Sequence, residues 1–227
     1  MIDLTGWTIV FDLDGTLVDT APDLVHAMNH ALEAEGYQPA PHAVGRQFIG
    51  SGAKAMLRGA AEWQGLTLSE DVIHTLWERF IPYYKAHIAD HSALFPDATE
   101  ALEELERYGA ILAVCTNKTQ GLTDQLIDTL AIRSIFKAIV GSDSVPSKKP
   151  DGDHIRRTVL AAGGIPAKTI MIGDSTTDAG AAADLGVPLV FANFGYGPAP
   201  ESSAPNTYWL EDYSSLVTLV RGIAVKA

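Results

Sequence analysis

Short apolar runs with the length of β-strands are spaced along the chain, and helical patterns separate the later ones. The predicted strands cover residues 7–13, 110–115, 136–140, 169–172 and 187–191. The predicted helices between or after them cover 97–108, 119–130, 151–162 and 177–185. The first of these helices starts with Asp97 and Glu100 at the spacing of a capping box. Because strand and helix alternate and the strands are almost continuously apolar, the pattern predicts a parallel sheet covered by helices on both faces.

This alternation is interrupted after the first strand, where three helical patterns follow one another without a strand between them. They cover residues 22–35, 52–63 and 69–87. The sequence therefore predicts an α/β protein with a Rossmann-like parallel sheet core and a small all-helical domain inserted after the first strand. We expect the core to consist of residues 1–16 and 93–227, and the helical domain of residues 17–92.

Composition excludes several classes of protein. The chain has 227 residues, of which 47% are hydrophobic, and a formal net charge of −12 with scattered Lys and Arg residues. Such a charge repels a nucleic-acid backbone, so we expect no nucleic-acid partner. No run approaches the roughly 20 apolar residues of a membrane span, and Met1–Trp7 lacks the features of a signal peptide. We expect a cytoplasmic protein without a membrane partner.

The first candidate chemical feature is a pair of carboxylates at the end of the first predicted strand. Asp12 and Asp14 are two residues apart, so they point to the same side of a strand. Their repulsion calls for a cation or for protonation of one carboxyl group, and the backbone N–H groups of Gly15 and Thr16 could face an anion. The alternative is a pair of turn aspartates without a chemical role.

A second carboxylate pair follows the strand 169–172, at the start of an alanine-rich helix. Asp174 and Asp178 are four residues apart, and hard oxygen ligands from two strand ends could enclose Mg²⁺. The alternative is helix capping by Asp174 or Ser175, with Asp178 placed favourably for the helix dipole. The two interpretations do not exclude each other.

Thr116, Asn117 and Lys149 also follow predicted strands, where ligands bind in open α/β sheets. The hydroxyl and amide could donate hydrogen bonds to phosphoryl oxygens, and the ammonium could neutralise their charge. Taken singly, each residue is equally well explained as a helix start or a solvated loop lysine. Lys148 is an alternative to Lys149.

The order and placement of these four motifs resemble the haloacid dehalogenase-like (HAD) hydrolase superfamily. The resemblance rests on Asp12 to Thr16 (Asp-Leu-Asp-Gly-Thr), on Thr116 with Asn117, on Lys149, and on Gly173 to Asp178 (Gly-Asp-Ser-Thr-Thr-Asp). It covers the whole core, and the helical insertion is similar to the small cap domain of that family. One departure is that the frequent second proline of a Lys-Pro-x-Pro motif is absent after Lys149.

The resemblance implies a phosphatase with Mg²⁺ as its cofactor and a small phosphorylated metabolite as its substrate. Asp12 would be the nucleophile that forms an aspartyl-phosphate, and Asp14 the general acid and base. The metal would be held by Asp12, Asp174 and the backbone carbonyl of Asp14. Asp178 and Ser175 would not hold the metal directly but would orient its ligands or Lys149. The remaining predicted phosphate contacts are Gly15, Thr16, Thr116, Asn117 and Lys149.

Within the superfamily the chain is similar to phosphoglycolate phosphatases, through Phe48 to Ala53 (Phe-Ile-Gly-Ser-Gly-Ala) and Phe194 to Gly197 (Phe-Gly-Tyr-Gly). This implies 2-phosphoglycolate as the substrate, and we expect Arg46 or Lys54 to meet its non-phosphate end. Asp14 argues against dehalogenases and phosphonoacetaldehyde hydrolases, which usually lack this carboxylate. A broad sugar-phosphate phosphatase, a phosphomutase and a regulatory module phosphorylated on Asp12 remain alternatives.

The histidines show no spacing that is typical of a metal site. His26 and His30 are four residues apart on a predicted helix, and we interpret them as surface or core residues rather than ligands. Nothing in the sequence indicates the oligomeric state, which leaves a monomer and a homodimer open.

Overall fold

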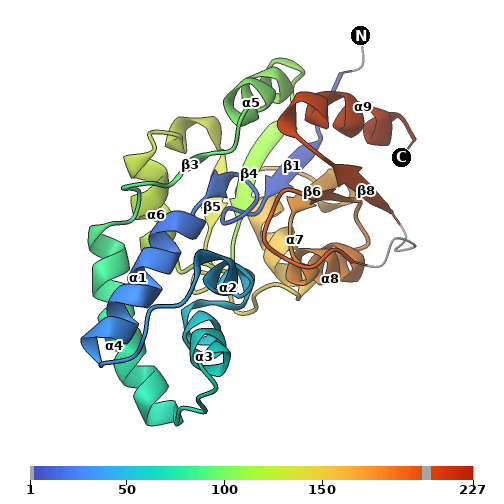
Figure 1. Ribbon diagram of the computed structural model, residues 1–227. Coiled ribbons are helices and arrows are strands. Elements are labelled where there is room, and N and C mark those ends of the chain that lie inside the picture. The colour runs from blue at the N-terminus through green and yellow to red at the C-terminus, as the bar shows by residue number, and fades with distance from the viewer. Residues whose placement is uncertain (1–2, 201–205, 227) are drawn as a thin grey trace.

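The core of the computed structural model, which describes residues 3–200 and 206–226, is a six-stranded parallel sheet. Its order is β5-β4-β1-β6-β7-β8 (Figure 1). The strands are β1 (Thr8–Phe11), β4 (Ile111–Cys115), β5 (Ala138–Val140), β6 (Thr169–Gly173), β7 (Leu189–Ala192) and β8 (Thr207–Leu210). In chain order this arrangement is 3-2-1-4-5-6, which is the Rossmann order. The prediction of a Rossmann-like parallel sheet is confirmed, while β8 was not predicted.

Helices cover both faces of the sheet, as the apolar strands predicted. One layer consists of α7 (Gly152–Ala161) and α8 (Thr176–Leu185), and the other of α5 (Ala98–Arg107), α6 (Gln120–Thr129) and α9 (Leu216–Lys226). Successive residues of β1 pack against opposite helix layers. Val10 lies in a cluster with Ile155 of α7, and Ile9 lies in a cluster with Leu105 of α5. This period-two alternation explains why the strands carry no polar face.

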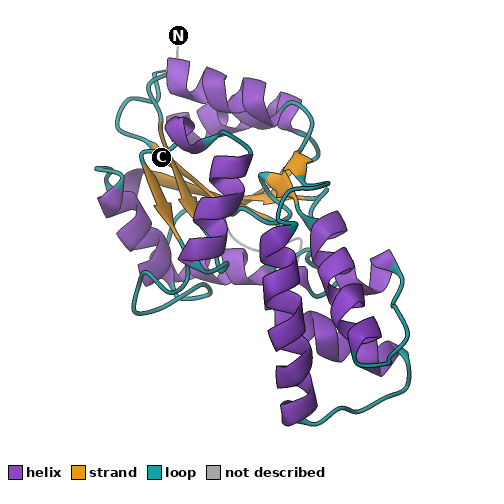
Figure 2. Cartoon of the chain, turned by 90° about the vertical axis from the view of Figure 1, so that its left-hand side faces the viewer, coloured by secondary structure: helices purple, strands orange, loops and turns teal. Residues whose placement is uncertain are grey.

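The residues between the first and second core strands form α1 (Ala21–Ala34), α2 (His42–Arg46), α3 (Ala53–Trp63) and α4 (Glu70–Ala86). The three predicted helices of this segment are confirmed, and α2 is an additional short helix. The four helices form a group that stands apart from the sheet (Figures 1 and 2). At its base β2 (Val18–Asp19) pairs antiparallel with β3 (Ala93–Leu94), so the two connections to the core lie side by side. We call the helical group α1–α4 the cap.

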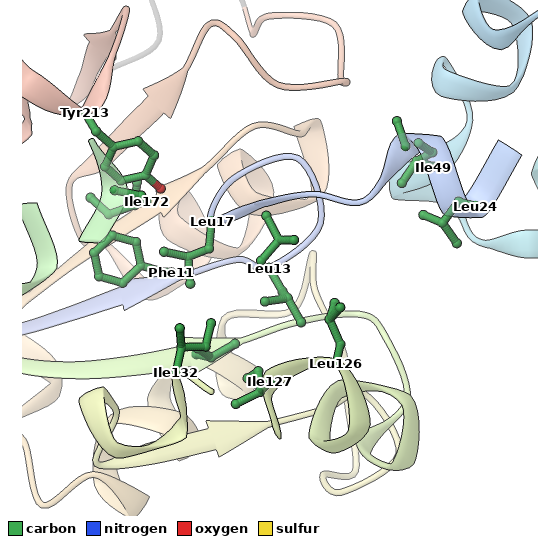
Figure 3. Packing of buried hydrophobic residues seen from close by; sticks show 14 of the residues in the cluster. Phe11, Leu13, Leu17, Leu24, Ile49, Leu126, Ile127, Ile132, Ile172 and Tyr213 are labelled. Atoms are coloured by element: carbon green, nitrogen blue, oxygen red, sulfur yellow. The ribbon is translucent and has the colours of Figure 1, made fainter. Parts of the chain in front are cut away.

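The loop that follows β1 is anchored in the apolar core beneath it. Leu13 and Leu17 are fully buried beside Phe11 and Ile172 (Figure 3). The hydroxyl group of Tyr213 donates a hydrogen bond of 2.8 Å to the carbonyl oxygen of Thr16. This packing fixes the backbone that carries the first carboxylate pair.

One local prediction is wrong. Asp97 does not form a capping box with Glu100, because its backbone is in the left-handed region at φ 62° and its side chain caps no N–H group. The helix starts there nonetheless, with Ala98, Ala101, Leu102 and Leu105 buried. Short 3₁₀ turns occur at Ile49–Ser51, Arg133–Ile135, Pro166–Lys168 and Tyr213–Ser215. In the described part of the chain, no helix has both the length and the apolarity to cross a membrane.

Candidate active site

The predicted motifs meet at the point where the strand order reverses. β1 lies between β4 and β6, and Phe11 is in register with Val114 on one side and Ile172 on the other. Asp12, Thr116 and Asp174 follow these strands closely, so they emerge at one edge of the sheet. Ligands of open α/β sheets bind at the carboxyl ends of the strands near such a switch point. The sequence spacing alone already predicted this convergence, and the structure contains it.

Lys149 connects two of the motifs. Its Nζ atom lies 2.7 Å from Oδ1 of Asp178 and 2.9 Å from Oδ1 of Asp12. It also donates a hydrogen bond of 2.8 Å to the carbonyl oxygen of Cys115. Burial alone would lower the pKa of Lys149, but the charges of Asp12 and Asp178 outweigh it and hold the pKa above its usual value. Lys149 is therefore a fixed cation, whereas its neighbour Lys148 is exposed.

Asp12 is a buried carboxylate, and one of its oxygen atoms lacks a hydrogen-bond partner among the described residues. Burial raises its pKa to about 6, although the charge of Lys149 opposes this. The contact with Lys149 lacks the alignment of a hydrogen bond, so Oδ1 of Asp12 has no hydrogen-bond partner among the described residues. An oxygen that is buried, close to a cation and not hydrogen-bonded retains a lone pair for another atom.

Asp174 is held by two hydrogen bonds. Its Oδ1 accepts from the hydroxyl group of Thr16 at 2.8 Å, and its Oδ2 accepts from the backbone N–H of Tyr196 at 2.7 Å. Burial, followed by the charges of Asp178 and Asp12, raises the pKa of Asp174 to about 7. Both shifts arise mainly from burial, and repulsion from the neighbouring carboxylates adds to it, so added positive charge would relieve the cluster.

A divalent cation would supply this charge. Asp12, Asp174 and Asp178 each offer a carboxylate oxygen, and these atoms lie within 4.8 Å of one another. Only one ammonium, that of Lys149, contacts this cluster among the described residues. A hard oxygen donor set at the end of two strands suits Mg²⁺. The side chain of Asp14 is not part of the cluster.

Asp178 is already fully engaged by the protein. Its Oδ1 accepts from Lys149, and its Oδ2 accepts from the backbone N–H of Ser175 at 3.0 Å and from the Ser175 hydroxyl group. Ser175 and Asp178 thus form a capping box at the start of α8. The helix-capping interpretation of this motif is confirmed for Ser175, and Asp178 also positions Lys149.

The sequence analysis missed Lys118. Its Nζ atom lies 2.8 and 2.9 Å from the two carboxylate oxygens of Asp14, and 4.8 Å from the ring centre of Tyr84 in the cap. Burial would lower the pKa of Lys118, but the charge of Asp14 outweighs it and the pKa is raised. Thr20 donates a further hydrogen bond of 2.8 Å to Asp14. The available signal was that Lys118 follows Thr116 and Asn117 directly.

The backbone N–H groups of Gly15 and Thr16 have partners within their own loop. They donate to the carbonyl oxygens of Val18 at 3.0 Å and Leu13 at 3.4 Å in a tight loop. The Thr16 hydroxyl group is likewise used by Asp174. Gly15 has φ 81°, and a Cβ atom at this position would collide with the carboxylate of Asp174. Both residues therefore help to position Asp174, and their contact with phosphate stays a prediction.

A cavity of about 670 Å³ lies between the sheet edge and the cap. Asp12 and Asp14 line it together with Thr116 and Asn117. Asn117 donates a hydrogen bond of 2.9 Å to the carbonyl oxygen of Lys149, and its own Oδ1 atom is buried without a partner among the described residues. Four lysines also line the cavity, namely Lys54, Lys85, Lys118 and Lys148. Asp143 is a third carboxylate in the lining, so the cavity combines three carboxylates with four lysines.

Lys54 and Arg46, the two residues predicted to contact the non-phosphate end of the substrate, lie in different places. Lys54 lines the cavity, with its Nζ atom 5.5 Å from the ring centre of Trp77. Arg46 is not one of the described residues that line this cavity. Its guanidinium donates hydrogen bonds of 3.0 Å to the carbonyl oxygens of Phe194 and Gly195, so it braces the loop that carries Tyr196. The structure thus favours Lys54 and assigns Arg46 a different contact.

This fold and this group of carboxylates define a class of protein. The model of the haloacid dehalogenase-like hydrolase family matches residues 9–192, and the chain belongs to this family. A phosphoglycolate phosphatase of Caulobacter vibrioides is 46% identical over 198 residues, which are 87% of this chain and 84% of that protein. A phosphoglycolate phosphatase of Agrobacterium fabrum is 39% identical and covers 91% of this chain and 89% of that protein.

Solved structures agree with this assignment. The crystal structure of a predicted phosphoglycolate phosphatase from Haemophilus somnus superposes with a TM-score of 0.86 at 28% identity. The superposition covers 96% of this chain and 99% of the other one. The parallel sheet and the inserted helices are therefore shared over essentially the whole length of both proteins.

Proposed function

We propose that this chain is a Mg²⁺-dependent phosphatase that hydrolyses 2-phosphoglycolate to glycolate and inorganic phosphate. The observation that carries the proposal is the buried Asp12 carboxylate at the wall of the cavity. One of its oxygens accepts no hydrogen bond from the described residues and has a fixed ammonium 2.9 Å away. The relatives from Caulobacter vibrioides and Agrobacterium fabrum, both described as phosphoglycolate phosphatases, support the substrate.

Asp12 would act as the nucleophile. Its attack on phosphorus forms an aspartyl-phosphate and expels the alkoxide, and water then cleaves this intermediate. Dividing one difficult displacement into two easier ones is the advantage of a carboxylate nucleophile. Lys149, held by Asp178, keeps positive charge beside the reacting oxygens, where negative charge is spread in the transition state. Thr116 and Asn117 line the same cavity and would donate to the remaining phosphoryl oxygens.

Asp14 would donate a proton to the leaving alkoxide and later accept one from the attacking water. In the structure it is paired with Lys118 through both oxygens. Because Lys118 occupies both oxygens, Asp14 can reach the leaving group only when this pair loosens. The negative phosphate of a substrate would draw Lys118 towards itself, since Lys118 lines the same cavity. Substrate binding would thereby release Asp14 for proton transfer.

Asp12 and Asp174 would hold Mg²⁺, together with the backbone carbonyl of Asp14. The ion would supply positive charge to a phosphoryl oxygen and offset the repulsion among the carboxylates. Thr16, Tyr196 and Ser175 fix the orientation of Asp174 and Asp178 through the hydrogen bonds described above. Such supporting contacts commonly change metal affinity by about 10- to 100-fold.

Steady-state kinetics on a panel of phosphate esters test the proposed reaction. With Mg²⁺ present we expect release of inorganic phosphate, with the highest kcat/KM for 2-phosphoglycolate, and we expect EDTA to abolish it. A glucose phosphate serves as the competing ester. Activity that EDTA leaves intact would contradict the metal assignment, and a preferred glucose phosphate would contradict the substrate. Transfer to a sugar without phosphate release would indicate a phosphomutase, and a stable aspartyl-phosphate without release a regulatory module.

Lys54 is the cap residue that we expect to contact the carboxylate of phosphoglycolate. Lys54→Met should lower kcat/KM for this substrate by about 10- to 100-fold, since a hydrogen bond to a charged group contributes about 1.5–3 kcal/mol. An ester without a carboxylate, such as p-nitrophenyl phosphate, should lose much less. Arg58→Met is the matched control, because Arg58 lies one turn further along α3 and pairs with Glu70 at the surface. Equal losses on both substrates would exclude Lys54 as the carboxylate contact.

A further inference from the structure

Three potential metal ligands gather at the base of the cap, on the described part of the chain. Asp23 and His26 belong to α1, and His91 lies in the segment that returns from α4 to β3. One ligand atom from each lies within 4.8 Å of the others. The two imidazole rings meet edge to face with their centres 5.2 Å apart. Both histidines are exposed, whereas Asp23 is only 2% exposed.

The position of this group is fixed by hydrogen bonds. Oδ2 of Asp23 accepts from the backbone N–H groups of His91 at 3.0 Å and Ser92 at 2.8 Å, and from the Ser92 hydroxyl group at 2.6 Å. The carboxylate therefore holds the backbone that carries His91. His26 is three residues beyond Asp23 on the same helix, so it lies on the same face one turn on. The neighbouring β2–β3 pair holds both segments together from the other side.

The other carboxylate oxygen of Asp23, Oδ1, accepts fewer hydrogen bonds than Oδ2. Among the described residues it accepts only from the N–H of His91, at 3.1 Å, and shares this donor with Oδ2. A carboxylate oxygen has two lone pairs, so one remains available. Fixed outer contacts of this kind orient a metal ligand before the ion arrives.

From this geometry we infer that Asp23, His26 and His91 form a binding site for a divalent transition-metal ion of the zinc class. Two imidazole nitrogens and one carboxylate oxygen are a donor set that suits Zn²⁺, with water in the fourth position. Bonds of about 2.1 Å in a tetrahedron place ligand atoms about 3.4 Å apart. The two exposed rings can rotate to close the remaining distance, while Asp23 stays fixed.

This site differs in chemistry from the carboxylate cluster of Asp12, Asp174 and Asp178, which offers only oxygen atoms. It also lies outside the residues that line the catalytic cavity. The inference therefore holds whether or not the proposed function is correct. A bound ion would link α1 to the segment after α4, and thus join the two connections between cap and core. The expected consequence is a more stable attachment of the cap.

Metal titration of the full chain in excess Mg²⁺ tests the site, because Mg²⁺ keeps the carboxylate cluster occupied. We expect about one Zn²⁺ per chain at micromolar or lower concentration. Cobalt(II) in its place should give the strong visible absorption of tetrahedral coordination, which an all-oxygen octahedral site does not give. Zinc at 100 times its dissociation constant should raise Tm by about 5–10 °C.

His26→Ala and His91→Ala should each weaken Zn²⁺ binding at least about tenfold and remove the cobalt spectrum. The control is His74→Ala, since His74 is an exposed histidine of α4 that stacks on Trp77. Asp23 is left unchanged because its carboxylate also holds residues 91 and 92. Wild-type zinc affinity in both histidine variants, or no tetrahedral cobalt spectrum in the wild-type chain, would overturn the inference.

Discussion

Asp12→Asn is expected to abolish phosphate release, with a loss of at least about 10⁴-fold in kcat. The amide has the shape of the carboxylate but is a poor nucleophile, so the first step of the reaction is lost for every phosphate ester. The fold should remain intact, because Lys149 keeps its partner Asp178. Phosphate release and thermal unfolding of the same preparation check both expectations.

Asp14→Asn is the informative control for this variant. A p-nitrophenolate leaving group needs little protonation, so the first step should continue with p-nitrophenyl phosphate while the second step loses its general base. We expect a burst of about one equivalent of nitrophenol per chain followed by slow turnover. Asp12→Asn should show neither burst nor turnover. Mg²⁺-dependent phosphate release by Asp12→Asn at a rate near that of the wild type would refute the nucleophile assignment.

Lys149→Met is expected to reduce both activity and stability. The substitution leaves Asp12 and Asp178 buried without their ammonium, and breaking a buried ion pair costs about 3–5 kcal/mol in the free energy of unfolding. Removing a preorganised charge from the phosphoryl site should lower kcat by about 10²- to 10³-fold. Denaturant unfolding and steady-state kinetics in Mg²⁺ measure the two effects.

Two further variants distinguish the effect of the charge on stability from its effect on activity. Lys148→Met changes the neighbouring exposed lysine and should alter the free energy of unfolding by no more than about 0.5 kcal/mol. Lys149→Met combined with Asp178→Asn removes the unpaired charge of Asp178, so it should recover part of the stability but none of the activity. If Lys148→Met lost the activity and Lys149→Met kept it, the choice between the two lysines would have to be reversed.

The fold and the centre of the site could be predicted because they depend on local patterns. Apolar runs mark buried parallel strands, and each motif directly follows one of them. Since all parallel strands end at one edge of a sheet, Asp12, Thr116 and Asp174 had to come together. β8 escaped prediction because its four residues, Thr207–Leu210, are mostly half-buried and lack a long apolar run.

Errors and omissions arose where a residue depends on a distant partner. Lys118 is 104 residues from Asp14 in the chain, and no spacing rule links them. Arg46 donates to carbonyl oxygens of residues 194 and 195, and the first of these is 148 residues away in the chain. In each case a polar group with several potential partners took the one that the folded backbone placed nearest.

By itself, the sequence determined the parallel sheet, the inserted helices and the carboxylate and lysine motifs at the strand ends. Periodicity and chain order suffice for these features, since they follow from backbone geometry and burial. Only the tertiary structure decided which groups are paired: Lys149 with Asp12 and Asp178, Lys118 with Asp14, and Asp23 with the backbone that carries His91. Hydrogen bonds and ion pairs act over about 3 Å, and distances on this scale exist only after the chain has folded.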